Sequence, residues 1–125
     1  MRKVKSVEWP TIGLVVICYA LWLLLSALAG GSSSPLLWWM LIPALAAVTT
    51  LHASLCHEAL HGHPTRRARI NEAMVGLAVG LFIPYRRFRT LHLRHHANAQ
   101  LTDPYDDPES FYLAERDWDN LGPFM

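Results

Sequence analysis

The chain has 125 residues, of which 52% are hydrophobic and 17% charged, with 11 Lys and Arg against 10 Asp and Glu. This length allows one domain at most. The hydrophobic residues fall in long runs, which is typical of membrane proteins. The basic residues flank these runs and form no basic surface with interleaved aromatic residues, so we expect no nucleic-acid partner. The composition therefore predicts that residues 1–125 form a single all-α integral membrane domain.

The first hydrophobic run predicts a transmembrane helix over about residues 11–29. Its length is close to the roughly 20 residues that cross the hydrocarbon core of a bilayer. Basic residues precede it, as they do in a signal peptide, but a signal peptide has a shorter apolar region of roughly 7–15 residues. A second apolar run also follows at once. We therefore favour an uncleaved transmembrane helix.

The second run begins with Ser34 as a candidate N-cap and Pro35 at the first helical position. It continues to Gly62 and Pro64, which are a typical helix end. A transmembrane span over about residues 36–55 accounts for the apolar part. A helix of about 26 residues is roughly 39 Å long and exceeds the roughly 30 Å core. Its last two turns are therefore expected to project into the aqueous interface.

A third apolar stretch, in the segment from about residue 71 to 84, is too short to span a bilayer. Arginines stand on both sides of it, at positions 66, 67, 69, 86, 87 and 89. Basic residues at both ends place both ends on the same side of the membrane. The segment is therefore predicted to be a short interfacial or re-entrant helix.

The basic residues also predict the topology. They precede the first span and follow the second, whereas the connecting loop has none. By the positive-inside rule, both termini are expected in the cytoplasm and the chain in the cell (inner) membrane. The region that follows the second span is then cytoplasmic.

Two histidine clusters occupy this cytoplasmic region, in the runs HEALHGH and HLRHH. A spacing of three or four residues puts side chains on one face of a helix, so each cluster can direct imidazoles at one point. Neutral imidazole is a common ligand of iron, zinc, copper and nickel. The candidate metal ligands are His57, His61, His92, His95 and His96. His52 and His63 are secondary candidates; as alternatives, His52 is a polar residue facing protein and His63 a loop residue.

A polar tail over residues 97–125 contains two Asp-Pro steps and most of the acidic residues, with a short helix expected near its end. A solvated surface is the simplest interpretation of these acids. Asn98 and Asp103 follow the second cluster closely enough to act as hydrogen-bond partners of its histidines. Cys18 and Cys56 are interpreted as buried thiols.

The two clusters carry a family resemblance. HEALHGH matches the H-x-x-x-H box, and HLRHH the H-x-x-H-H box, of the membrane fatty acid desaturase superfamily. The order of the boxes, their separation of about 30 residues and the flanking residues from Ala46 to Phe111 are also similar to that superfamily. The resemblance implies two iron ions, dioxygen as co-substrate and the five histidines as iron ligands: His57, His61, His92, His95 and His96.

The resemblance implies an oxidoreductase of lipid metabolism that abstracts hydrogen from an unactivated C–H bond, with fatty acyl (acyl-lipid) desaturation as the first expectation. Hydroxylation or ketolation of a carotenoid or another lipid stays open. An electron donor such as a ferredoxin is implied. The superfamily has a third histidine box that does not occur here, so the chain resembles an N-terminal portion. A homo-oligomer or a second chain could complete its site.

Two alternatives from other classes remain. HEALH also satisfies the H-E-x-x-H motif of zinc peptidases, with His57 and His61 as ligands and Glu58 as general base. A membrane zinc metalloprotease has no use for HLRHH, however, and we prefer the iron oxidoreductase. The other alternative is a non-catalytic, truncated membrane protein that keeps the motif without the activity.

Overall fold

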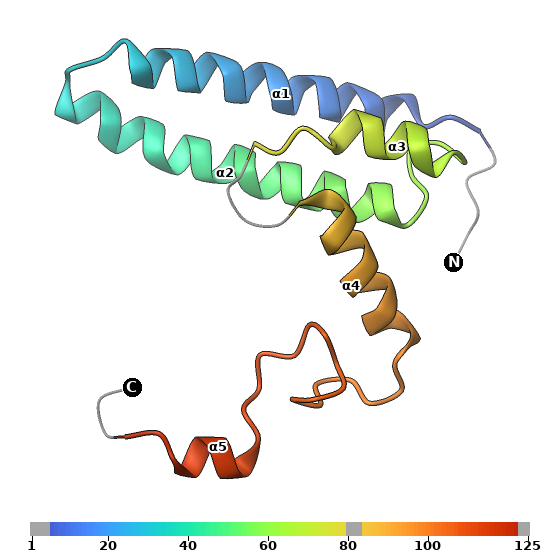
Figure 1. Ribbon diagram of the computed structural model, residues 1–125. Coiled ribbons are helices and arrows are strands. Elements are labelled where there is room, and N and C mark those ends of the chain that lie inside the picture. Colours follow the sequence, from blue (N-terminus) through green and yellow to red (C-terminus); the bar gives the residue numbers. More distant parts are fainter. Residues whose placement is uncertain (1–5, 80–83, 123–125) are drawn as a thin grey trace. The chain divides into compact units, whose positions relative to one another are not determined.

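A computed structural model describes residues 6–79 and 84–122, and within these residues all regular structure is helical (Figure 1). The predicted all-α class is confirmed. The chain divides into two compact units, residues 1–85 and 86–125. The basic N-terminal residues Arg2, Lys3 and Lys5, and residues 80–83 of the predicted interfacial segment, lie outside the described part.

The first unit is built on an antiparallel hairpin of two long helices, α1 (Trp9–Gly30) and α2 (Pro35–Leu60) (Figure 1). Each helix has a proline in its first turn, where the missing N–H costs no hydrogen bond. The two helices contain the predicted spans 11–29 and 36–55, and both are long and apolar enough to cross a membrane. Much of their apolar surface is exposed, including Val16, Leu23 and Ile42.

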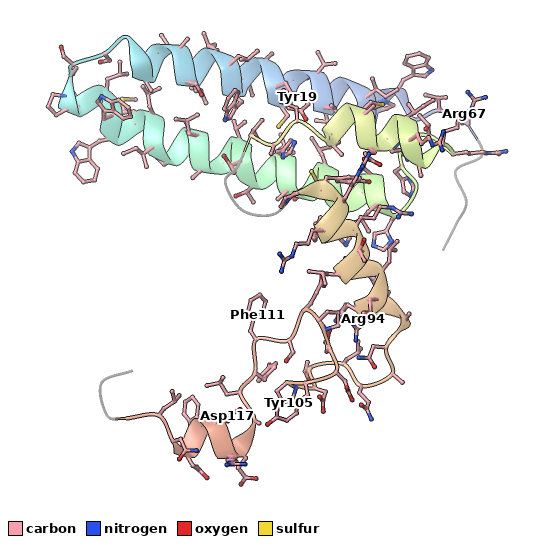
Figure 2. All side chains as sticks on the ribbon, in the orientation of Figure 1. Tyr19, Arg67, Arg94, Tyr105, Phe111 and Asp117 are labelled. Atoms are coloured by element: carbon pink, nitrogen blue, oxygen red, sulfur yellow. The ribbon has the colours of Figure 1, made fainter. Side chains whose placement is uncertain are left out.

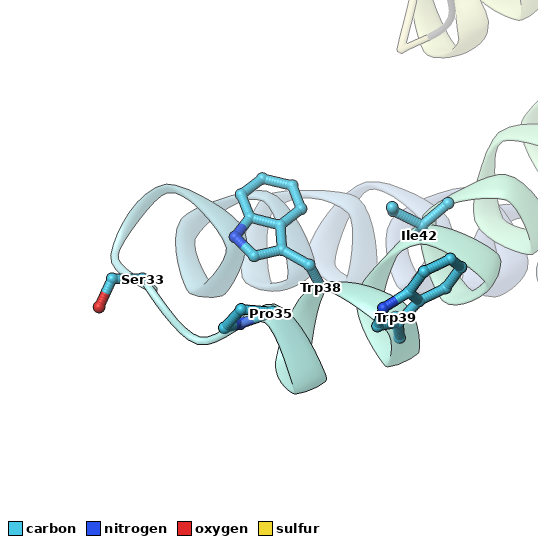
Figure 3. Close-up of a pocket in the computed structure, with 5 residues that line it drawn as sticks. All are labelled: Ser33, Pro35, Trp38, Trp39 and Ile42. Atoms are coloured by element: carbon cyan, nitrogen blue, oxygen red, sulfur yellow. The ribbon is translucent and has the colours of Figure 1, made fainter.

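Tryptophans lie near both ends of this hairpin. Trp9 begins α1 and is 73% exposed, whereas Trp38 and Trp39 lie in the first turns of α2, at the opposite end. The Trp38 indole donates to the Ser32 carbonyl oxygen (3.2 Å), which ties it to the interhelical turn. Trp38, Trp39 and their neighbours line an apolar recess of about 340 Å³ (Figure 3). Tryptophans at both ends of an apolar hairpin are typical of helices that sit between two membrane interfaces.

Polar contacts join the two helices in the middle and at one end. Cys18 Sγ lies 3.6 Å from the Val48 carbonyl oxygen, and both cysteines are buried, as expected. At the end where α1 begins, the Glu8 carboxylate accepts from His63 Nδ1 (2.9 Å), and the Glu8 N–H donates to the Pro64 oxygen (3.0 Å). These bonds attach the start of α1 to the turn that follows α2.

A short helix, α3 (Ala68–Val75), packs against α2, and its anchor is Asn71. The Asn71 side chain is fully buried. Its Oδ1 accepts from the Thr65 N–H (3.1 Å) and hydroxyl (2.6 Å), and its Nδ2 donates to the Thr65 oxygen (2.9 Å) and the Ala59 oxygen (3.5 Å). A buried amide with every bond satisfied holds the turn after α2 in one conformation. The predicted interfacial segment is therefore helical only to Val75 among its described residues.

The second unit contains most of α4 (Tyr85–Ala97), a loop with two Asp-Pro steps, and the short helix α5 (Glu115–Asp119). The loop folds back on itself through hydrogen bonds from Asn98 Nδ2 to the Asp106 oxygen (2.9 Å) and from the Ser110 hydroxyl to the Thr102 oxygen (2.8 Å). It is therefore an ordered part of the unit.

We predict that Gly62→Ala lowers the free energy of unfolding by about 1 kcal/mol, because the φ of +94° at this glycine lies in the left-handed region that a Cβ disfavours. Chemical denaturation in mild detergent measures the change. Gly13→Ala is the matched control, since Gly13 is helical and a Cβ there meets nothing within 4 Å. An equal loss in both variants would contradict the prediction.

Candidate metal centre

The first histidine box lies at the end of α2, in the turns beyond the predicted span. The His57 and His61 rings are 4.6 Å apart between centroids and stand at 71° to each other. Their spacing of four residues brings them to one face of the helix. Helix α2 ends at Leu60, His61 is its C-cap residue, and the left-handed Gly62 turns the chain away. Both rings are partly exposed, so the box lies at the surface of the first unit.

The second box lies within the second unit, on the last two turns of α4. The ring centroids of His92 and His96 are 4.6 Å apart, and His95 lies 5.9 and 5.7 Å from these two rings. The Nε2 atoms of His92 and His96 are 3.0 Å apart. Two nitrogens that bind the same ion, each at about 2.1 Å and with a right angle between the two bonds, are also about 3 Å apart. The pair therefore has a spacing that suits a shared metal ion.

Two carboxylates accept hydrogen bonds from histidines of this box, through the ring nitrogen Nδ1. His92 Nδ1 is 2.8 Å from Glu109 Oε2, and His95 Nδ1 is 2.8 Å from Asp107 Oδ1. An ionised carboxylate only accepts hydrogen bonds, so the proton of each ring is on Nδ1. The lone pair is then on Nε2, which is the nitrogen that a metal would use. A carboxylate that holds a histidine in this way is the usual outer support of a metal ligand.

The loop is built around Asp107, whose side chain is nearly inaccessible to solvent. Besides His95, it accepts the backbone N–H of Glu109 (3.0 Å) and of Thr102 (2.9 Å). Burial raises the pKa of this carboxyl, but the hydrogen bonds from Glu109, His95 and Thr102 outweigh it and bring the pKa to about 2. The carboxylate thus stays charged below pH 3.8, where an ordinary aspartic acid is half protonated.

These two carboxylates are not the ones that the sequence indicated. Asp103 Oδ1 accepts the backbone N–H of Tyr105 and of Asp106, and Asn98 bonds to the backbone of the same loop. Both therefore shape the loop. Asp107 and Glu109 were interpreted as solvated surface. The available signal was the Asp-Pro-Glu step, which places two carboxylates two residues apart beside a helix with two histidines three residues apart.

The two secondary candidates have partners within the first unit. His52 is 7% exposed, and its Nε2 lies 3.1 Å from the Tyr19 hydroxyl. His63 is bonded to Glu8. The structure thus brings together His57 with His61 in the first unit, and His92 with His95 and His96 in the second.

Comparison with known proteins gives one match. The family model described as fatty acid desaturase matches residues 33–125, which include both histidine boxes and the two supporting carboxylates. No curated protein and no solved structure matches the chain.

We predict that Asp107→Asn loosens the loop of the second unit, because an amide cannot accept from His95 and two backbone N–H groups as a charged carboxylate does. Faster hydrogen exchange at the amides of Thr102 and Glu109 is the expected result. Asp106→Asn is the control, since Asp106 is exposed. Unchanged exchange in Asp107→Asn would show that this carboxylate does not order the loop.

Proposed function

Because the chain belongs to the fatty acid desaturase family, we propose that it acts as a membrane-bound, oxygen-dependent diiron oxidoreductase on a fatty acyl lipid. The observation that carries the proposal is the pair of hydrogen bonds from the second box, His92 to Glu109 and His95 to Asp107. They fix two imidazoles in the tautomer that binds a metal through Nε2.

The proposed ligands are the five histidines of the two boxes: His57, His61, His92, His95 and His96. Iron bound there would activate dioxygen, the oxidant that an unactivated C–H bond requires, which acid–base groups cannot do. The chain's own contribution is to hold neutral nitrogen donors in a fixed orientation. Helix α2 orients the first box through the spacing of its histidines. The loop that follows α4 orients the second box through its carboxylates.

The donor set suits iron, which is the metal that the family implies. Imidazoles suit iron and zinc, and the outer carboxylates raise the basicity of the rings to which they are bonded. The Phe88 ring lies beside His92, with ring centroids 5.5 Å apart and the ring planes at 40° to each other. We propose that further ligands for a two-iron site come from outside these two boxes.

The surface that leads to the first box supports a lipid substrate. An apolar recess of about 590 Å³ follows α2 and ends at the first box. The Thr50 and Ser54 hydroxyls on this recess bond to carbonyls of their own helix, at 2.9 and 3.2 Å. The recess therefore offers mainly hydrocarbon to a bound molecule. Its lining residues are Leu14, Thr50, Leu51, Ala53, Ser54, Leu55, His57 and Glu58.

The finer assignment follows from the same arguments. We propose acyl-lipid desaturation first, with hydroxylation or ketolation of a carotenoid or another lipid as the alternative within the superfamily. A one-electron donor such as a ferredoxin would supply reducing equivalents. The positive-inside rule places both termini in the cytoplasm, which puts both boxes on the side where such a donor is found.

A zinc peptidase built on HEALH gains no support from the second box. Such an enzyme needs Glu58 as general base and has no role for carboxylates bonded to His92 and His95. Glu58 is exposed on α2, one residue from His57. We therefore assign Glu58 no part in the chemistry.

We predict that the chain, purified in mild detergent from iron-replete cells, contains iron, and that His92→Ala or His95→Ala removes it. Glu109→Gln should weaken iron binding by about 10- to 100-fold, because His92 loses the negative charge of its acceptor. Elemental analysis and titration with ferrous iron measure both effects. Asp103→Asn and His63→Ala are the controls, and zinc at one ion per chain would overturn the proposal.

We further predict that Glu58→Gln leaves the iron content unchanged, because Glu58 is not among the proposed ligands. Elemental analysis of the purified variants measures it. A zinc peptidase predicts the opposite pattern, in which metal is kept after His95→Ala and proteolysis is lost after Glu58→Gln.

A further inference from the structure

We propose that residues 65–79 form a re-entrant segment, which enters the bilayer from the side of the first histidine box and presents an apolar face to the acyl chains of the lipids. The proposal rests on the crossing of the membrane by α1 and α2 that the proposed function includes. The sequence alone left two placements open for this segment, an interfacial helix on the surface and a re-entrant one.

The first observation is the depth of Leu77 along α1. The Tyr19 hydroxyl donates to the Leu77 carbonyl oxygen at 2.9 Å. Tyr19 lies ten residues beyond Trp9, the start of α1, which is about 15 Å at 1.5 Å per residue. Counted from residue 11, where the predicted span begins, the depth is about 12 Å in a core of roughly 30 Å. Figure 2 shows Tyr19 on α1, directed toward the chain that follows α3.

The second observation gives the depth along α2. Cys56 Sγ lies 3.7 Å from the Val75 carbonyl oxygen, and Cys56 lies four residues before Leu60, the end of α2, or about 6 Å along the helix. His52, whose Nε2 lies 3.1 Å from the Tyr19 hydroxyl, lies eight residues before Leu60, or about 12 Å along the helix and inside the predicted span. The two antiparallel helices thus place Val75 about one turn, and Leu77 about two turns, below the end that carries the first box.

Carbonyl groups explain why polar side chains occur at this depth. After Val75 the segment leaves the helix, so the carbonyls of its last turn lose their intrahelical donors. Irregular backbone within a bilayer persists only where the protein satisfies it. Tyr19 supplies a donor to Leu77, and His52 Nε2 in turn donates to the Tyr19 oxygen (3.1 Å). This role accounts for a buried histidine in an apolar helix.

Other polar residues of α2 behave differently. The hydroxyls of Thr49, Thr50 and Ser54 bond to the carbonyls four residues before them, at 2.8, 2.9 and 3.2 Å. Such local bonds let a hydroxyl sit in an apolar helix without an outside partner. Tyr19 and His52 instead serve the α3 segment. The polar groups therefore gather where the segment lies and not along the hairpin in general.

The outer face of the segment fits hydrocarbon. Ile70 and Leu77 are 40% and 70% exposed, and Ala73 between them is also exposed. Ile70 and Ala73 are three residues apart in α3 and lie on one side of it, away from the buried Asn71 and Val75, and Leu77 follows the helix. If the segment lay on the membrane surface, Leu77 would lie among lipid headgroups, above the level of Tyr19, and the bond between them would not form. Exposed arginines stand at the shallow end of the segment, where headgroups are expected: Arg66, Arg67 and Arg69.

Thiol labelling tests the depth. Single cysteines are introduced as Leu77→Cys, Ile17→Cys and Arg67→Cys in the full chain that carries Cys18→Ala and Cys56→Ser. A charged, water-soluble maleimide is then applied to both sides of the membranes. Ile17 is the control for a crossing helix, since it is 52% exposed and lies near Tyr19 in α1. Arg67 is the control for the aqueous surface.

We expect Leu77→Cys to react as slowly as Ile17→Cys, about tenfold or more slower than Arg67→Cys, because the reagent does not enter hydrocarbon. Labelling of Leu77→Cys at the rate of Arg67→Cys, with Ile17→Cys protected, would overturn the re-entrant segment and leave the crossing helices intact. Fast labelling of Ile17→Cys as well would overturn the membrane crossing itself.

A second set of variants tests the role of Tyr19. In the Leu77→Cys chain, Tyr19→Phe removes the donor to the Leu77 carbonyl and should raise the labelling rate severalfold. Thr50→Val is the matched control, because that hydroxyl serves only its own helix. Equal rates in the two variants would show that the hydroxyl does not hold the segment at depth.

Discussion

The carbonyl groups of the chain between the two histidine boxes need hydrogen-bond donors beside two apolar helices, and much of the first unit follows from this constraint. Asn71 satisfies the turn after α2, and Tyr19, supported by His52, satisfies the end of the segment at Leu77. These side chains also attach α3 to α2 directly behind the first box. The same hydrogen bonds therefore satisfy the backbone and keep the end of α2 in place.

In the second unit the imidazoles have to be oriented on a helix in which Tyr85 is the one buried residue. Packing alone does not fix these rings, because His92 and His95 are partly exposed and His96 is exposed. The loop supplies carboxylates instead, and a charged acceptor fixes both the orientation and the tautomer of a ring. Asp107 can act in this way because Thr102 and Glu109 donate to it and keep it ionised. The folded loop thus keeps the rings of His92 and His95 in one orientation.

Sequence reasoning found the histidines and missed the groups that hold them. A spacing of three or four residues on a helix is a local property, so HEALH and HLRHH could be interpreted directly. The partner of His92 is 17 residues away and that of His95 is 12 residues away, across a loop with two prolines. Which acid reaches which ring depends on how the loop folds. Asp103 and Asn98 are closer in sequence but are used by the loop backbone.

The sequence by itself determined the two long helices, their proline starts, the glycine end at Gly62 and the histidine clusters, because each depends on neighbouring residues or on hydrophobic length. It also carried the family, through two boxes in order. Only the tertiary structure decided that His52 serves Tyr19 and that Asp107 and Glu109 support the second box. Those are contacts between residues far apart in sequence, and a spacing pattern carries no information about which of several polar groups will meet.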